Sequence, residues 1–131
     1  MKAHFIFNFV LLGLFSNFLS AQYFQHISNK EGFNQNTVNT IEIDKSGFLW
    51  FGTPNGLIKH DGYSFESYTY DPVAQYTLSD NYINRLAIDS VGVVWIGTRN
   101  GLNIFNSKSN SFFFNTETEN KTISAVKVFN D

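Results

Sequence analysis

The chain has 131 residues, a length that ordinarily forms one domain. It contains 15 Phe, 6 Tyr and 2 Trp against only 2 Pro, and this aromatic bias favours strands. The formal net charge of −2 gives no basic surface for a nucleic acid. The absence of cysteine excludes disulfides, cysteine-based zinc sites and thiol catalysis.

The N-terminus has the order of a secretory signal peptide. Lys2 is followed by an apolar run from Phe5 to about Leu19 and then by the small residues Ser20 and Ala21. The alternatives are a buried helix or a membrane anchor, but the run is shorter than the roughly 20 residues that a spanning helix needs. We therefore expect a signal helix over 1–21, cleavage after Ala21, and export.

Two stretches of the chain repeat one another without a gap. Residues 36–57 align with residues 81–102 at an offset of 45, and 11 of the 22 positions are identical. A third copy begins at Thr122, where Val126 and Val128 take the places of Leu86 and Ile88. A period of this length indicates a repeat architecture.

Each repeat is predicted to form four short strands joined by three tight turns. The strands of the first unit are TVNTIEID, FLWFGT, GLIKHD and YSFESY; those of the second are YINRLAID, VVWIGT, GLNIFN and FFFN. Gly47 and Gly92 supply turns with positive φ. Asn55-Gly56 and Asn100-Gly101 predict type I′ hairpin turns, which need positive φ at both central residues.

A four-stranded unit with a period of about 40–50 residues is typical of a β-propeller blade. We therefore predict an all-β fold of four-stranded antiparallel sheets, with two blades and the start of a third in an incomplete ring. In this interpretation the repeated tryptophans, Trp50 and Trp95, fill the space between blades, and Gly52 and Gly97 permit close backbone approach. The alternative is that the indoles form a stacking platform for a sugar.

The repeated phrase resembles the two-component regulator propeller repeat. The resemblance extends over nearly all of 23–131, including the lead-in at 23–36 and the bridge SYTYDPVAQYTLSDNYI. We take as structural repeat signature Asp44, Gly47, Trp50, Gly52, Thr53 and Gly56, with Asp89, Gly92, Trp95, Gly97, Thr98 and Gly101.

The resemblance implies the N-terminal, periplasmic sensor region of a hybrid two-component histidine kinase. In such proteins many blades are followed by a further β-sandwich domain, an inner-membrane helix, and a cytoplasmic kinase that feeds a phosphorelay. Many respond to oligosaccharides. The resemblance therefore implies as partners the remaining blades, the downstream sensor domains and an oligosaccharide ligand.

No residue constellation in the sequence predicts an enzyme. His26 and His60 have no metal-ligand spacing, and His60 falls on a strand, where packing is the better interpretation. Asp44 and Asp89 could suggest a cation site, but an aspartate before a glycine turn more often bonds its own backbone. We expect no catalytic residues, no cofactor and no metal, and the ligand-binding residues are unknown.

The predicted organisation is a signal peptide at 1–21, a leading strand and link at 22–35, blade 1 at 36–80, blade 2 at 81–121, and the first strand of a third blade at 122–131. Within the link, Tyr23–Ser28 is the predicted strand. The main function hypothesis is a sensory, ligand-binding propeller. The alternatives are a structural or protein-interaction propeller and, more weakly, part of an exported propeller enzyme. Because two blades leave apolar edges unpaired, we also expect self-association.

Overall fold

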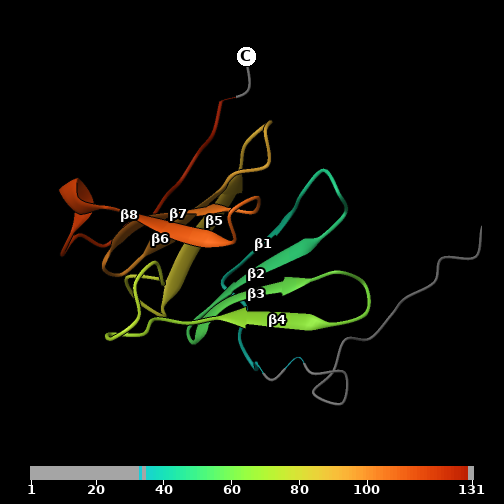
Figure 1. The fold of residues 1–131 in the computed structure, drawn as a ribbon, viewed down its shortest axis with the longest axis horizontal. Helices are drawn as coiled ribbons and strands as arrows, with labels where there is room; N and C mark the ends of the chain where they lie inside the picture. The colour runs from blue at the N-terminus through green and yellow to red at the C-terminus, as the bar shows by residue number, and fades with distance from the viewer. Residues whose placement is uncertain (1–32, 34, 130–131) are drawn as a thin grey trace, which may run out of the picture.

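The structure is a computed structural model, and it describes residue 33 and residues 35–129. Within these residues, eight strands form two four-stranded sheets with strand orders β1-β2-β3-β4 and β5-β6-β7-β8. All six pairings are antiparallel between strands consecutive in the chain. Figure 1 shows the two sheets packed beside one another as two blades of a propeller. The all-β prediction and the predicted four-stranded blades are confirmed.

The strand positions follow the sequence pattern closely. Blade 1 consists of β1 (Thr40–Ile43), β2 (Leu49–Thr53), β3 (Gly56–His60) and β4 (Phe65–Tyr68). Blade 2 consists of β5 (Ile83–Ile88), β6 (Val94–Thr98), β7 (Gly101–Asn106) and β8 (Ser111–Asn115), followed by the short 3-10 helix η2 (Thr116–Thr118). No helix among the described residues is long and apolar enough to cross a membrane.

The main hydrophobic core lies between the blades. It combines Trp50 and Leu57 of blade 1 with Leu78, from the segment that joins the blades, and with the blade 2 side chains Ile83, Leu86, Val94, Ile96, Phe105 and Phe112. The Trp50 and Phe105 ring centroids are 5.3 Å apart, and Tyr68 packs against Phe105 and Phe112. A single twisted sheet leaves this apolar surface exposed to water. Because each blade covers the apolar face of the other, the two blades stabilise each other.

The turns between the second and third strands differ from the sequence prediction. The register pairs Thr53 with Gly56, so Pro54 and Asn55 are the two central residues of the turn. Gly56 has φ +129°, whereas Asn55 is not among the described residues with positive φ. A type I′ turn is therefore wrong here, and one reason is that proline fixes φ near −65°. Glycine is still required, because a Cβ at position 56 would lie 2.5 Å from the Tyr68 carbonyl oxygen.

The predicted first strand of a third blade is not formed over 122–129. These residues have no strand assignment, although the main-chain N–H of Ile123 donates to the Thr98 carbonyl at 2.9 Å. A strand needs a neighbouring ladder, and no described residue pairs with this segment in that way. The signal helix at 1–21 and the leading strand Tyr23–Ser28 lie outside the described residues. The predicted domain boundaries stay predictions.

Candidate functional site

The aspartate of the repeat signature connects a turn to a tryptophan. Asp44 Oδ1 accepts from the main-chain N–H groups of Ser46 and Phe48, at 2.9 and 3.1 Å. Its other oxygen, Oδ2, accepts from the Trp50 indole Nε1–H at 3.0 Å. The predicted turn role of Asp44 is therefore present. The bond to the indole was not predicted, although the shared six-residue spacing in both repeats is a signal that could have suggested it.

Asp89 repeats the same arrangement in blade 2. Its Oδ1 accepts from Val91 and Val93, at 3.0 and 2.9 Å, and its Oδ2 accepts from Trp95 Nε1 at 3.2 Å. Burial raises the pKa of Asp89, but the hydrogen bonds from Val93, Trp95 and Val91 outweigh it and hold the pKa below the ordinary value. No group of three or more His, Cys, Asp or Glu that could hold a metal ion occurs in the part of the chain that the structure describes.

The signature threonines and glycines also have structural roles. Thr53 Oγ1 donates to the Gly56 carbonyl at 2.8 Å and accepts from Asn55 N–H at 3.1 Å, and Thr98 does the same with Gly101 and Asn100. A Cβ at Gly52 would lie 2.6 Å from Cγ2 of Ile83 in the next blade. The signature thus fixes turns and the distance between blades.

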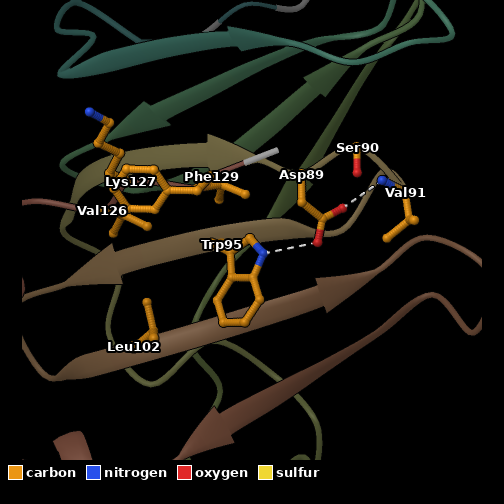
Figure 2. Close-up of a pocket in the computed structure, with 9 residues that line it drawn as sticks. Asp89, Ser90, Val91, Trp95, Leu102, Val126, Lys127 and Phe129 are labelled. Carbon is orange, nitrogen blue, oxygen red and sulfur yellow. Dashed lines mark hydrogen bonds between the residues drawn. The ribbon is translucent and has the colours of Figure 1, made fainter. Parts of the chain in front are cut away.

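The two tryptophans have different surroundings. Trp50 is only 1% exposed, because blade 2 covers it. Trp95 is partly exposed and lines a pocket of about 560 Å³ together with Asp89, Ser90, Val91, Leu102 and residues 126–129. Figure 2 shows the indole lying over the face of the sheet, with Leu102 and the C-terminal segment around it and Asp89 bonded to its nitrogen. The predicted inter-blade role is confirmed for Trp50.

A second hollow lies beside residues 69–82, which join β4 to β5 and are called the link between the blades from here on. It is at the end of the sheets opposite Asp44 and Asp89. It measures about 300 Å³ and is lined by the link 70–72, 74 and 76–79, and by Asn100, Phe114 and Glu119. Tyr76 is 65% exposed and has φ +62°, a conformation that is strained for a tyrosine. Tyr76 and Thr77 also line two adjoining hollows of about 340 and 330 Å³.

A buried asparagine holds this link in place. Asn103 is fully buried in the inter-blade core, where its Oδ1 accepts from Ser79 N–H at 3.0 Å and its Nδ2 donates to Ser79 Oγ at 2.7 Å. Asn103 does not belong to the repeated pattern, because blade 1 has Ile58 at the equivalent position, so sequence reasoning missed it. Tyr76 contributes a further anchor, since its carbonyl accepts from Phe112 N–H at 3.2 Å.

The histidine that the sequence placed on a strand has a packing role. His60 is buried on β3, and its ring stacks on Phe65 with centroids 4.1 Å apart. Its Nδ1 is 2.9 Å from the Ser64 carbonyl oxygen. His26 lies outside the described residues.

Comparison with known proteins agrees with this architecture. The family model described as "Two component regulator propeller" matches residues 32–55 and 77–100. The chain is 37% identical over 78 residues to histidine kinase P4 of Formosa agariphila, a match that covers 56% of this chain and 6% of that protein. It also resembles the crystal structure of the extracellular domain of a putative hybrid two-component system from B. thetaiotaomicron, with a TM-score of 0.63 and 35% identity over 72% of this chain and 14% of that one.

The matched segments contain the turn aspartates, both tryptophans and the glycines at positions 47, 52, 92 and 97. The chain spans only a small part of both relatives. It carries two copies of the two-component regulator propeller repeat and is a propeller segment related to the extracellular regions of hybrid two-component sensor kinases.

Proposed function

We propose that this chain is the extracytoplasmic, ligand-binding propeller segment of a two-component sensor, and that its ligand is an oligosaccharide. The observation that carries the proposal is the relation to the extracellular domain of a hybrid two-component system, together with the hollow beside the link. The kinase and the phosphorelay would belong to other parts of such a sensor. The segment itself would bind the oligosaccharide and would catalyse no reaction.

The chemistry of the hollow supports a sugar ligand. Tyr70, Tyr76 and Phe114 offer flat rings against which the C–H faces of a pyranose or furanose ring can pack, and the tyrosine hydroxyls are polar groups at the ring ends. The Glu119 carboxylate and the Thr77 hydroxyl add hydrogen-bonding groups for sugar hydroxyls. The lining presents more polar than apolar surface, which suits a ligand rich in hydroxyl groups.

Binding is tested by isothermal titration calorimetry of the purified chain with soluble malto-, cello-, xylo- and fructo-oligosaccharides. We expect saturable heat with at least one of these series. Tyr76→Ala should weaken that binding by about tenfold or more, equivalent to about 1.4 kcal/mol, because it removes the exposed ring. The matched control is Tyr63→Ala, which removes a 95% exposed tyrosine from the turn between β3 and β4, at the other end of the blade. The absence of heat with all four series, or equal effects of the two variants, would contradict the proposal.

Export is tested separately. We propose a periplasmic location directed by the signal peptide at 1–21. Expression of the full chain in a Gram-negative host should give a periplasmic product whose N-terminus, determined by mass spectrometry, is Gln22. An uncleaved product retained in the cytoplasm would contradict this part of the proposal.

A further inference from the structure

Two adjoining hollows share one part of the link between the blades. The hollow of about 300 Å³ and a neighbouring one of about 330 Å³ are both lined by Asp71, Tyr76 and Thr77. Because the same three residues form a wall of each hollow, the two are joined along the link. We call the pair the link trough, with the hollow of about 300 Å³ as its first hollow and the other as its second.

The link trough crosses from one blade to the other. Its first hollow extends to Asn100, in the turn between β6 and β7, and to Glu119, which follows η2. Its second hollow extends to Ser67 and Tyr68 on β4 and to Phe112 on β8. Figure 1 shows the link, in yellow-green, looping beside blade 2 on its way from β4 to β5. The trough therefore belongs to the contact between these two blades.

Hydrogen bonds hold the shared wall of the trough in one shape. Thr77 Oγ1 accepts from the Asp71 N–H at 3.3 Å and donates to the Asp71 carbonyl at 3.2 Å, which closes the loop between these two residues. The Tyr76 carbonyl accepts from the Phe112 N–H at 3.2 Å, which fastens the same loop to the edge of β8. The wall is thus formed before any ligand arrives, which lowers the entropy cost of binding.

Tyr76 stands at the centre of this wall in a strained conformation. Its φ of +62° is unfavourable for a bulky side chain, and strain of this kind gathers at ligand sites. The strain does not serve burial, because the side chain is 65% exposed. It serves instead to present one aromatic ring to both hollows.

The charges of the lining determine which sugars fit. Among the described residues that line the two hollows, Asp71 and Glu119 are charged and none is Lys, Arg or His. A uronic acid or a sulfated sugar would bring a negative charge beside these carboxylates, and like charges placed together oppose binding. An uncharged sugar avoids this repulsion, and its hydroxyl groups can donate to the same carboxylates.

We propose that the link trough binds an uncharged oligosaccharide lengthwise, with sugar units on both sides of the Tyr76 ring. This inference rests on the proposed function and adds to it the length and the charge of the ligand. Each hollow alone is at the small end of the usual range for ligand sites, about 300–1,000 Å³. A short sugar therefore fills one hollow, and a longer chain gains the contacts of the second.

The test is calorimetric titration of the purified chain with the neutral malto-, cello-, xylo- and fructo-oligosaccharides, each from the monosaccharide to the hexasaccharide. In a series that binds, affinity should rise at least about tenfold from the monosaccharide to the tetrasaccharide and then level off, because a tetrasaccharide spans both hollows. Tetragalacturonate, an acidic chain of the same length, should bind at least about tenfold more weakly than the neutral tetrasaccharide. Glu119→Gln should reduce that difference.

A variant that narrows the second hollow separates long ligands from short ones. Ser67→Leu should weaken tetrasaccharide binding by about tenfold, whereas a disaccharide should lose much less, because it still fits the first hollow. Ser67 is exposed, so the substitution leaves the core in place. Ser46→Leu is the matched control; it makes the same change at an exposed serine in the turn between β1 and β2 and should bind both ligands like the wild type. Circular dichroism checks that both variants are folded.

The outcomes separate this inference from the proposed function. Affinity that does not increase with chain length, or tetragalacturonate that binds as tightly as the neutral tetrasaccharide, would overturn the inference and leave sugar binding in place. Equal losses of disaccharide and tetrasaccharide affinity in Ser67→Leu would also overturn it. The absence of heat with every neutral series would overturn the proposed function and the inference together. The first two comparisons use the wild type, so they hold even where a variant does not fold.

Discussion

The Asp44 carboxylate accepts the Trp50 indole N–H at 3.0 Å while its other oxygen holds the turn between β1 and β2. Asp89 and Trp95 form the same pair in blade 2, at 3.2 Å. One carboxylate thus couples a local turn to the orientation of a large side chain in the inter-blade core. The pairing explains why the two residue types recur together at a fixed spacing.

The first prediction concerns this pair. Asp44→Asn should destabilise the protein by about 1–3 kcal/mol, because a charged acceptor for the indole and two main-chain N–H groups is replaced by a weaker one. Urea unfolding of the wild type, Asp44→Asn, Trp50→Phe and the double variant forms a double-mutant cycle. The cycle gives the interaction energy between Asp44 and Trp50. A coupling energy of zero would show that the carboxylate acts through the turn alone.

The second prediction compares two glycines at equivalent positions. Gly52→Ala should destabilise by about 1–3 kcal/mol, because its Cβ would lie 2.6 Å from Cγ2 atoms of both Ile83 and Thr40 within a packed core. Gly97→Ala should destabilise the protein less than Gly52→Ala. Its Cβ would lie 2.7 Å from Ile123 Cγ2, but Ile123 belongs to a segment without strand assignment and can shift. Thermal unfolding of both variants measures the difference. Equal losses would contradict the difference in packing between the two interfaces.

The third prediction uses the two tryptophans as reporters of the inter-blade space. Trp95→Phe leaves the buried Trp50, whose emission should be blue-shifted and weakly quenched by acrylamide. Trp50→Phe leaves the partly exposed Trp95, whose emission should be red-shifted and strongly quenched. Both measurements are made at dilutions where the chain is monomeric by sedimentation. The reverse order of quenching would contradict the burial of Trp50 and the partial exposure of Trp95.

The fourth prediction concerns stability at low pH. The main-chain N–H groups of Ser64 and Tyr63 donate to Asp61 and lower its pKa to about 2, and the pKa of Asp89 is also held below the ordinary value. A carboxyl whose folded pKa is depressed contributes stability above its unfolded pKa of about 3.9 and loses it as pH falls through the folded pKa. Asp61→Asn should therefore be less stable than the wild type at pH 6. The difference in their free energies of unfolding should become smaller between about pH 4 and pH 2.

Urea midpoints of the wild type and Asp61→Asn across this range provide the measurement. Asp71→Asn is the matched control, because Asp71 Oδ1 also accepts two main-chain N–H bonds in a turn, one of them long, at 3.3 Å from Ala74 N. A gap that stays constant down to pH 2 would contradict the role of the Asp61 charge.

The periodic features of this fold were predictable from sequence because each depends on residues close together in the chain. Alternating apolar residues and turn glycines located the eight strands of the described part of the chain, and the 45-residue offset identified two equivalent sheets. Packing residues such as Trp50 repeat with the blades, so the repeat itself indicated architecture rather than catalysis. The type of the hairpin turn in blade 1 was predicted wrongly. Its central residues are 54 and 55, one residue earlier than predicted, and the first of them is a proline.

The local residue pattern by itself determined the blade, its strands and the role of the signature aspartates in turns, since these are interactions within a few residues. Only the tertiary structure decided that Trp50 is covered while Trp95 lines a pocket, because that difference depends on what packs against each blade. It also placed Asn103 in the core, bonded to a link 24 residues earlier in the chain. Burial and long-range hydrogen bonds depend on the contact between the sheets, and the sequence of a repeat does not show what packs against it.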